Sequence, residues 1–342
     1  MALMSEPAMP SPHSFVPPRL HAPASGDGWV EDGAGQKFWG RFGAAGLLVF
    51  DRERGVLLQH RANWSHFGGT WGLPGGAKHE NETPVQGAIR EAHEEAGVAV
   101  EALKLKFTFT LDLGFWSYTT VVVETTAPFD AAVADAESIE MRWVPIDEIE
   151  ALPLHPGFGA AWPMLRGELE HGDVIVVDAA NVIGSRPNGW WKDRLGATEK
   201  FAAALNTLGV AGLTGEALGS AVENSRWWPE VVLVVEGQAS AAKLVEHPVT
   251  VDSALVDSAL PEPALPEPGP GTNEIAERLR IVRSPRDGDQ QIVDTVEALT
   301  AKPTPAHVWV VTADRELAGR VTALGARVLG PSWLWALLDN AI

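Results

Sequence analysis

The sequence contains no cysteine among its 342 residues. This absence excludes disulfide bonds and metal sites built on thiolates, and it is compatible with a cytoplasmic protein. No run of 18 or more apolar residues occurs, so we expect no membrane-spanning helix and no membrane partner. The N-terminus lacks a basic segment followed by an apolar run, so we expect no signal peptide and predict a cytoplasmic location.

Positive charge is also scarce. The chain has 26 Lys and Arg residues against 45 Asp and Glu residues, which gives a formal net charge of -19 at pH 7. This balance argues against a protein that coats nucleic acid through general electrostatics. It leaves open a site that meets nucleic acid through bound metal ions and a local basic patch.

Length and local composition divide the chain into regions, since 342 residues are comfortable for two domains. Residues 1–36 are rich in Pro, Ser, Gly and Ala, and we expect this N-terminal segment to be disordered. We place one domain at 37–170 and a second at 173–342, with a flexible Pro- and Glu-rich insertion at 254–271. The sequence leaves the oligomeric state open.

The first domain has the pattern of a mixed sheet between helices. Strands are expected at Ala45–Phe50 and Val56–His60 as a hairpin, then at Leu105–Leu111, Ser117–Glu124 and Glu140–Val144, with helices starting at Ile146 and over Gly159–Leu169.

The stretch from Gly76 to Val98 carries the strongest local signals. Thr83 suits a helix N-cap, Pro84 suits the first helical position, and Gln86 is placed as the capping-box partner of Thr83. Gly97 is placed to end the helix in a left-handed conformation. These signals predict a helix over Pro84–Ala96.

Three glutamates share one face of that helix. Glu91, Glu94 and Glu95 lie at i, i+3 and i+4, a spacing at which like charges repel. One interpretation is a solvated acidic face, the usual position of a Glu run. The other is a site for Mg²⁺ or Mn²⁺, because hard cations prefer carboxylate oxygens and keep water ligands that substrate phosphates replace.

The whole stretch resembles the Nudix box. The matching fixed positions are Gly76, Glu82, Arg90, Glu91, Glu94, Glu95 and Gly97, with Ala92 and Val98 at the apolar places. This resemblance covers residues 38 to 170 and implies an α/β/α sandwich with a mixed sheet. It also implies hydrolysis of a nucleoside diphosphate linked to another moiety, with Mg²⁺ or Mn²⁺ as cofactor and a nucleotide as substrate.

The Nudix resemblance also implies roles for single residues. Arg90 would orient Glu91 by ion pairing, and one of the box glutamates, or a later one such as Glu137, would accept a proton from the attacking water. We therefore take Glu91, Glu94 and Arg90 as candidate catalytic residues. The implied metal-binding residues are Glu91, Glu94, Glu95 and the Gly76 carbonyl.

Several residues before the box have two interpretations. Trp64, Phe67 and Trp71 stack on a base or pack in the core and loops, and Trp64 is our substrate-binding candidate among them. Arg61 contacts substrate phosphate or forms an ordinary surface ion pair.

The second domain alternates strands and helices, which predicts a doubly wound fold with a mainly parallel sheet. The predicted strands are Val174–Val177, Val231–Val235, Leu279–Val282, His307–Val311 and Arg327–Leu329, and the predicted helices are Thr198–Leu208, Thr214–Glu223, Asp289–Leu299, Asp314–Leu324 and Ser332–Leu338.

Acidic residues follow four of these strands. They are Asp178, Glu236, Asp289 and Asp314. Functional sites in parallel sheets lie beyond the carboxyl ends of the strands, so these carboxylates predict one metal-binding patch. Any single Asp among them is equally explained as a helix N-cap.

This half resembles the PIN-like nucleases of the bacterial NYN group. The matching segments are Val176–Gly184, Val235–Gly237, Gly288–Ile292 and Val311–Asp314. The resemblance implies metal-dependent cleavage of RNA, with Asp178, Asp289 and Asp314 as metal ligands and Glu236 and Asn181 in support. Positive charge for RNA, or for ordinary surface pairing, would come from Lys192, Arg194, Arg278, Arg280, Arg283 and Arg286.

Together these features predict an α/β protein of two domains. The leading hypothesis is a Mg²⁺- or Mn²⁺-dependent Nudix pyrophosphohydrolase followed by a metal-dependent ribonuclease, with RNA as a partner of the second domain. The alternative is a nucleotide-sensing regulator or an RNA-turnover protein in which one of the two domains binds without turnover.

Overall fold

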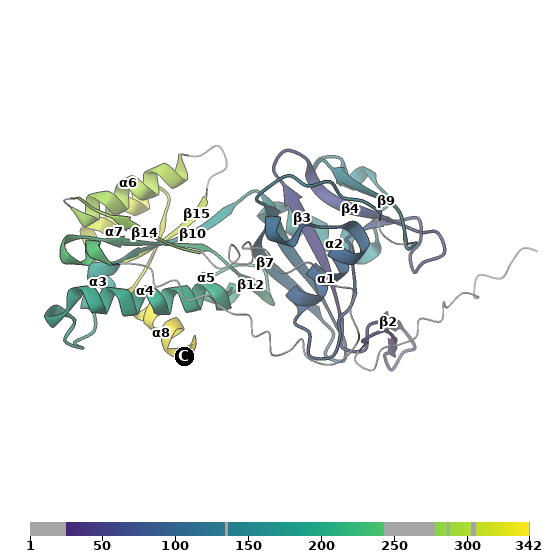
Figure 1. The fold of residues 1–342 in the computed structure, drawn as a ribbon, viewed down its shortest axis with the longest axis horizontal. Coiled ribbons are helices and arrows are strands. Elements are labelled where there is room, and N and C mark those ends of the chain that lie inside the picture. The colour runs from purple at the N-terminus through teal and green to yellow at the C-terminus, as the bar shows by residue number, and fades with distance from the viewer. Residues whose placement is uncertain (1–24, 134–135, 243–277, 286, 302–305, 342) are drawn as a thin grey trace, which may run out of the picture.

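The structure is a computed structural model that describes residues 25–133, 136–242, 278–285, 287–301 and 306–341. Predictions for 1–24, for Arg286 and for the insertion at 254–271 lie outside the described residues. The two halves of the chain lie side by side along the longest axis of the molecule (Figure 1). The predicted α/β class is confirmed, with a mixed sheet first and a separate parallel sheet second.

The N-terminal half is built on a nine-stranded mixed sheet. Its main path runs β11-β12-β7-β8-β3-β4-β5, with β6 paired to β3 and β9 paired to β4. Two of these strands, β11 (Leu213–Thr214) and β12 (Ser225–Trp227), come from the C-terminal half. Those from the N-terminal half are β3 (Ala44–Asp51), β4 (Gly55–Arg61), β5 (Trp71–Gly72), β6 (Gly75–Ala77), β7 (Leu103–Asp112), β8 (Ser117–Thr125) and β9 (Ser138–Val144). The predicted hairpin is confirmed, because β3 pairs antiparallel with β4.

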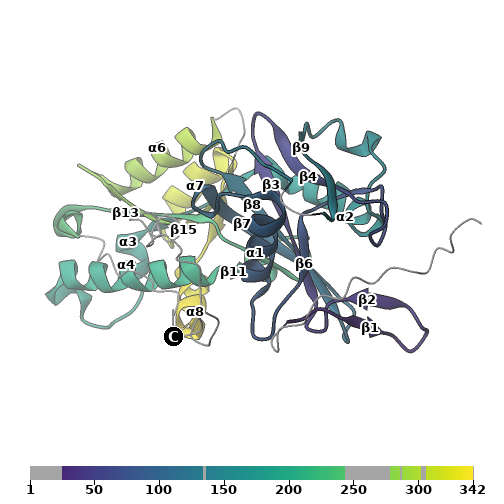
Figure 2. The same ribbon diagram turned by 45° about the vertical axis from the view of Figure 1, so that its right-hand side comes forward.

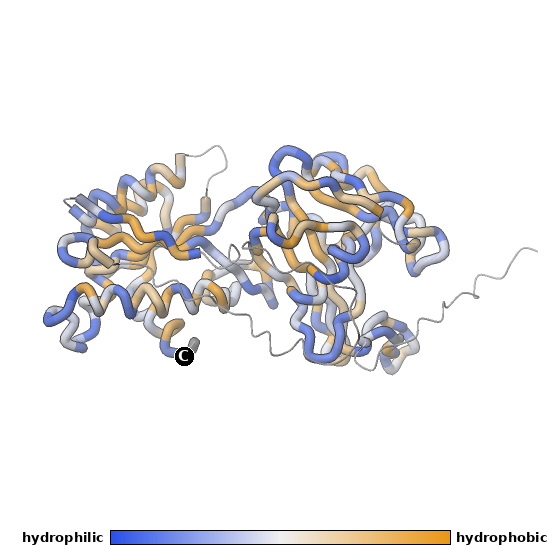
Figure 3. Tube along the Cα trace, in the orientation of Figure 1, coloured by the Kyte–Doolittle hydropathy of each residue, from blue (hydrophilic) through white to orange (hydrophobic). Residues whose placement is uncertain are grey.

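Two helices cover opposite faces of this sheet. Alternate residues of β3 point to opposite sides, so Leu47 packs toward helix α1 (Pro84–Ala96) while Leu48 packs toward helix α2 (Pro156–Leu169). The apolar strands run through the middle of each half in Figure 3, between more polar surfaces. The helix that we expected from Ile146 is only a short 3₁₀ turn, Ile149–Ala151.

A two-stranded ribbon precedes the main sheet. Strand β1 (Trp29–Glu31) pairs antiparallel with β2 (Lys37–Trp39). Figure 2 shows this ribbon projecting from the N-terminal half, away from the C-terminal half. The expectation of disorder over residues 1–36 is therefore wrong for residues 29–31.

The C-terminal half has a five-stranded sheet in the order β14-β13-β10-β15-β16, and every neighbouring pair is parallel. The strands are β10 (Gly172–Asp178), β13 (Glu230–Val235), β14 (Leu279–Arg283), β15 (Ala306–Val311) and β16 (Arg327–Leu329). From β10 the chain builds outward in one direction and then, from β15, in the other. The strand order therefore reverses between β10 and β15, where doubly wound sheets place their sites.

Helices lie on both faces of this sheet. One face packs on α3 (Ala179–Gly184), α4 (Arg194–Ala211) and α8 (Pro331–Ala341), and the other packs on α6 (Gly288–Thr300) and α7 (Arg315–Ala323). The short helix α5 (Gly215–Leu218) packs instead on β11 and β12. The predicted helix over Thr214–Glu223 is wrong, because Gly219 takes a left-handed conformation with φ 65° and ends α5 after one turn.

The chain then forms two short strands that join the other half. Strand β12 (Ser225–Trp227) pairs with β11 (Leu213–Thr214) and antiparallel with β7. The Trp227 ring stacks on Phe107 with 4.4 Å between ring centroids. Residues of the C-terminal half therefore extend the sheet of the N-terminal half.

Two buried cations support the same junction. Lys106 lies at an irregularity in β7, and its Nζ donates to the carbonyls of Leu169 and His171 at 2.6 and 2.7 Å. Arg278 donates to the carbonyls of Trp228 and Leu105. Arg278 therefore does not belong to the basic patch that we expected at the carboxyl edge of the parallel sheet.

No helix in the ranges that the structure describes is long and apolar enough to cross a membrane.

Candidate active site

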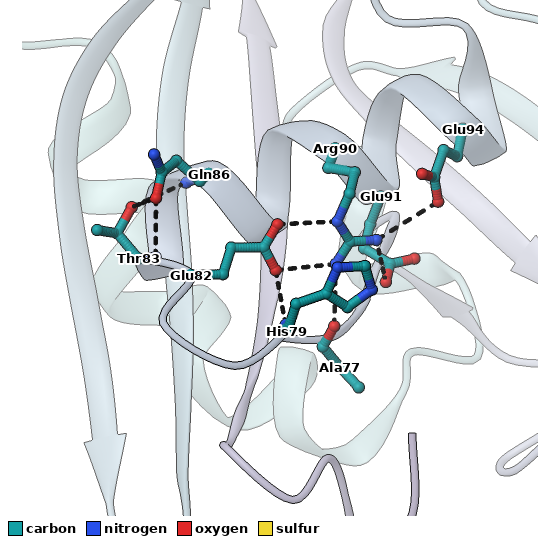
Figure 4. Close-up of polar contacts among 8 residues, drawn as sticks. All are labelled: Ala77, His79, Glu82, Thr83, Gln86, Arg90, Glu91 and Glu94. Carbon is teal, nitrogen blue, oxygen red and sulfur yellow. Dashed lines mark hydrogen bonds and ion pairs between the residues drawn. The ribbon is translucent and has the colours of Figure 1, made fainter. Parts of the chain in front are cut away.

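The predicted loop and helix are confirmed in detail. Helix α1 begins at Pro84, and the Thr83 hydroxyl accepts the Gln86 backbone N–H at 3.2 Å while the Gln86 side chain accepts the Thr83 N–H at 3.0 Å. Gly97 ends the helix with φ 62°. Figure 4 shows the capping pair at one end of α1 and the charged residues along the helix. The caps fix which residues of α1 face the loop before it.

Arg90 is the hub of the charged residues. Its Nε and Nη2 donate to the two carboxylate oxygens of Glu82 at 2.8 and 3.0 Å, and its Nη1 donates to Glu91 Oε1 at 2.9 Å (Figure 4). A further bond runs from Nη2 to the Ala77 carbonyl at 3.1 Å. Burial alone would raise the pKa of Glu82, but the bonds from Arg90 and from the His79 N–H outweigh it and lower that pKa.

Glu91 is held against the glycine loop. A Cβ built on Gly76 would lie 2.7 Å from the Glu91 carboxylate, so any residue other than glycine would displace this carboxylate. Burial raises the pKa of Glu91, Arg90 partly offsets the effect, and the charges of Glu94 and Asp27 raise the pKa further. Asp27, from the segment before β1, is an acidic neighbour that sequence reasoning missed.

Glu95 and Glu94 differ in their surroundings. Glu95 is buried, and its Oε2 accepts the Gly75 backbone N–H at 3.0 Å and lies 3.5 Å from the Gln59 Nε2. Glu94 is 59% exposed and approaches Arg90 Nη1 at 3.4 Å. The three glutamates of the acidic face thus span from a buried to an open position.

The acidic face fits a divalent cation. Glu91 has a raised pKa and lies against the Gly76 backbone, and carboxylate oxygens are the donors that a hard cation prefers. Among the described residues, no three Asp, Glu or His side chains lie close enough together to hold a metal ion as they stand, in either half of the chain.

Other candidates surround this face. Arg61, at the end of β4, donates from Nε to the His66 carbonyl at 3.1 Å and from Nη1 to Gln59 Oε1 at 3.3 Å. Both acceptors are neutral, so these bonds leave the positive charge of the guanidinium unneutralised. Glu137 is partly buried, and its carbonyl accepts the Ala62 N–H at 2.8 Å, which places it beside the Arg61 end of β4.

Aromatic side chains line the same end of the sheet. Trp71 is buried and stacks on His60 at 4.6 Å, so it belongs to the core, whereas Trp64 is 49% exposed. A second group, which we call the aromatic wall, comes from three separate segments, and only Phe67 among its members was a candidate from the sequence. The aromatic wall consists of Trp29, His66, Phe67 and His155, with successive ring centroids 5.4, 4.2 and 4.7 Å apart.

Phe67 and His155 are unusual within the wall. Phe67 is 44% exposed and has φ 55°, a conformation that costs a bulky residue strain energy and is found at functional sites more often than elsewhere. Burial, together with the charges of Arg61 and His66, lowers the pKa of His155 to about 4. His155 is therefore neutral at pH 7 and presents an uncharged ring.

The four predicted acidic residues of the C-terminal half also come together, at the carboxyl edge of the parallel sheet. Buried Asp178 accepts the Asn181 N–H at 3.0 Å and the Thr312 hydroxyl at 2.9 Å. Burial and the charges of Asp178, Asp314, Asp287 and Glu236, in that order, raise the pKa of Asp289. We call Asp178, Glu236, Asp289 and Asp314 the acidic edge.

Both interpretations of these aspartates hold in part. Asp178 and Asp314 are N-caps, of α3 and α7, and Asp314 Oδ1 accepts the Leu317 N–H at 2.8 Å. Asp289 is not a cap, since Asp287 caps α6. Glu236 Oε2 accepts the Gly288 N–H at 2.9 Å, and Asn181 Oδ1 accepts the Ala313 N–H at 3.3 Å.

The predicted basic residues spread over the half. Arg280 pairs with Glu230 and Arg283 bonds to the Ser240 and Ala242 carbonyls, while Arg194 lies over the Trp190 ring at 5.3 Å.

Comparison with known proteins agrees with the N-terminal site. The NUDIX domain family matches residues 40–167. "Putative 8-oxo-dGTP diphosphatase 3" of Mycobacterium tuberculosis (strain ATCC 25618 / H37Rv) is 51% identical over 151 residues, which cover 41% of this chain and 69% of that protein. A "Nucleoside triphosphate pyrophosphatase/Nudix hydrolase fusion protein" of Bifidobacterium longum (strain NCC 2705) is 38% identical over 164 residues, which cover 46% of this chain and 34% of the relative.

The Nudix hydrolase RenU of M. smegmatis is 48% identical, covers 42% of this chain and 94% of its own, and superposes with a TM-score of 0.38.

A mixed sheet between helices, with an acidic helix face beside a glycine loop, defines a hydrolase of pyrophosphate bonds. The chain belongs to the Nudix family, and it is a Nudix pyrophosphohydrolase. The family match ends at residue 167 and assigns nothing to the parallel α/β region that follows.

Proposed function

We propose that this enzyme hydrolyses an oxidised purine nucleoside triphosphate such as 8-oxo-dGTP, giving the nucleoside monophosphate and pyrophosphate. The observation that carries the proposal is the Glu91 carboxylate fixed between Arg90 and Gly76 beside the buried Glu95. Two relatives whose names specify 8-oxo-dGTP support the substrate class, the M. tuberculosis protein at 51% identity and a Proteus vulgaris protein at 41% identity over 69 residues.

Each residue of the site has a role in this reaction. Glu91, Glu94 and Glu95, with the Gly76 carbonyl, would hold Mg²⁺ or Mn²⁺, which when bound neutralises phosphate charge and polarises the attacking water. Arg90 fixes Glu91, and its five hydrogen bonds go to Glu82, Glu91, Glu94 and the Ala77 carbonyl rather than to substrate. Glu91, Glu94 or the partly buried Glu137 accepts the proton of the water.

Arg61 and the aromatic wall would receive the rest of the nucleotide. Arg61 lies among His66 and His155, close enough to lower the pKa of both imidazoles, and it supplies positive charge for a phosphate. The exposed ring of Phe67 offers a face to a purine. This placement favours Phe67 over Trp64, our earlier substrate-binding candidate, for stacking on the base.

A substrate panel with product analysis tests the proposal. Purified protein with Mg²⁺ or Mn²⁺ is offered 8-oxo-dGTP, dGTP, a dinucleoside polyphosphate and a sugar nucleotide, and the products are separated by chromatography. We expect the highest kcat/KM for 8-oxo-dGTP, with monophosphate and pyrophosphate as products. Phe67→Leu should raise KM for 8-oxo-dGTP about 10-fold or more, since base–aromatic stacking contributes roughly 1–3 kcal/mol. Preference for a sugar nucleotide would refute the substrate, and uptake without product would favour the sensing alternative.

For the C-terminal half we propose a metal-dependent ribonuclease of the PIN-like, NYN type. The convergence of Asp178, Glu236, Asp289 and Asp314 at the reversal point of a doubly wound sheet favours this function. Mg²⁺ or Mn²⁺ would be held there by the three aspartates, with Glu236 and Asn181 in support. The partner would be RNA.

The two activities are separable by mutation. Asp178→Asn should abolish Mn²⁺-dependent cleavage of a labelled single-stranded RNA and leave nucleotide hydrolysis unchanged, while Glu94→Gln should do the reverse. Cleavage that survives in Asp178→Asn, after further purification, would overturn the second function only.

We also propose that the domains extend over 37–170 and 173–342, with one exchange. Residues 213–227 of the second domain complete the sheet of the first.

A further inference from the structure

Gln59 is a fully buried polar side chain inside an apolar strand. It follows Leu57 and Leu58 in β4, and all three have 0% exposure. A buried amide costs free energy unless it is hydrogen-bonded, and a leucine at this position would continue the core. The amide at residue 59 therefore requires an explanation beyond packing.

The contacts of Gln59 join the two sides of the nucleotide site. Its Oε1 accepts Arg61 Nη1 at 3.3 Å, and its Nε2 lies 3.5 Å from Glu95 Oε2. A guanidinium only donates and a carboxylate only accepts, so these neighbours determine which way the amide points. Its Nε2 also donates to the Ser138 hydroxyl at 2.9 Å, which anchors the amide to β9.

Glu95 is held from two directions as a result. The Gly75 N–H reaches the same Oε2 atom at 3.0 Å that faces the Gln59 amide. Gly75 belongs to the loop strand β6, whereas Gln59 belongs to the sheet strand β4. The carboxylate is thereby fixed relative to both the glycine loop and the sheet.

We propose that Gln59 is a positioning residue that sets the Glu95 carboxylate and the Arg61 guanidinium relative to each other, so that the cation site and the phosphate site are aligned. This inference rests on the proposed roles of Glu95 in metal binding and of Arg61 in phosphate binding. A neutral amide fits this position, because it can hydrogen-bond to both Glu95 and Arg61 without neutralising the charge of either.

Gln59→Leu tests the proposal, since it keeps the approximate volume and removes every polar contact. Loss of residues that orient metal ligands commonly costs 10- to 100-fold in affinity or activity. We expect Mn²⁺ affinity of the nucleotide-free protein, followed by the electron paramagnetic resonance signal of free Mn²⁺, to weaken about 10-fold. We expect kcat/KM for the preferred nucleotide to fall about 10- to 100-fold.

A double-mutant cycle separates positioning from general damage. In the Glu95→Gln background there is no charged carboxylate left to position, so adding Gln59→Leu should change Mn²⁺ affinity by less than about threefold. Ser138→Ala, which removes only the anchor of the amide, should produce a smaller loss than Gln59→Leu. Thr119→Val is the matched control: it removes a buried strand hydroxyl that is hydrogen-bonded to the Thr110 hydroxyl, and it should leave Mn²⁺ affinity and kcat/KM unchanged.

Two results would overturn the proposal. One is Gln59→Leu with wild-type Mn²⁺ affinity and kcat/KM. The other is a loss of equal size in the wild-type and Glu95→Gln backgrounds, together with a lowered melting temperature, which would mean a structural role only. A wild-type protein inactive on every nucleotide would instead refute the proposed function, whereas the Mn²⁺ titration needs no substrate.

Discussion

Replacing Gly76 by alanine tests how strongly catalysis depends on the position of the Glu91 carboxylate. The new Cβ would lie 2.7 Å from both Cδ and Oε1 of Glu91, whereas ordinary contact begins at 3.4 Å. The three nearest atoms all belong to this carboxylate, so the carboxylate must move by about 0.7 Å to reach ordinary contact. Gly76 has no left-handed φ, so the alanine adds no backbone strain of its own.

The two consequences of this change differ in size. The displaced group is the end of a flexible side chain, so we expect the free energy of unfolding to fall by less than about 1 kcal/mol. A misplacement near 1 Å in a catalytic group can cost about 100-fold in rate, so we expect kcat to fall roughly 10- to 100-fold. The assay is steady-state nucleotide hydrolysis at saturating Mg²⁺, with a thermal melt of each protein.

Gly167→Ala is the control for this experiment. Gly167 lies in α2, where a Cβ meets nothing within 4 Å, so alanine should leave kcat unchanged and raise stability by roughly 0.5–1 kcal/mol. A Gly76→Ala enzyme with kcat within twofold of wild type would refute the argument that the glycine loop positions Glu91.

Three other predictions concern charge and the junction. Arg90→Met should lower kcat at least 10-fold and lower the free energy of unfolding by roughly 1–3 kcal/mol, since Glu82 and Glu91 lose their cation. An unchanged kcat with a lowered melting temperature would contradict the role of Arg90 in catalysis. Because the pKa of His155 is lowered to about 4, the free energy of unfolding should fall as pH falls from 6.5 to about 4. His155→Asn keeps a cap acceptor for Gly157, and urea titrations at pH 7 and 4.5 should show a smaller loss of stability in this variant than in wild type. Trp227 belongs to the second domain, yet Trp227→Ala should lower the free energy of unfolding of the first domain by roughly 3–5 kcal/mol, because its ring stacks on Phe107. Nucleotide hydrolysis should therefore be lost at a lower temperature on heating, and an unchanged inactivation temperature would show that the two halves are independent.

Helix α1 was predictable because its determinants are local. The Thr83–Gln86 capping box, Pro84 and Gly97 lie within one stretch of sequence, and each forms the contact that its position predicts. The common edge of Asp178, Glu236, Asp289 and Asp314 was predictable for another reason, since the carboxyl ends of parallel strands lie at one edge of their sheet.

Contacts between distant segments account for what the sequence did not reveal. The pairing of β12 with β7 joins residues more than 100 positions apart, and three-residue strands carry no periodicity that marks them. A helix does start near Thr214, as we predicted, with Thr214 as its N-cap, but Gly219 ends α5 before a second turn. His155 and Trp29 reach Phe67 only through tertiary packing, so no local motif includes them.

The most direct test of the account is the metal-dependent turnover of Glu94→Gln and Glu95→Gln. Both substitutions keep side-chain size and remove the negative charge from the acidic face. With 8-oxo-dGTP and Mg²⁺, we predict that kcat falls about 100-fold or more in each variant while the melting temperature stays close to that of wild type. Near-normal turnover in both variants would contradict the assignment of this helix face as the catalytic centre.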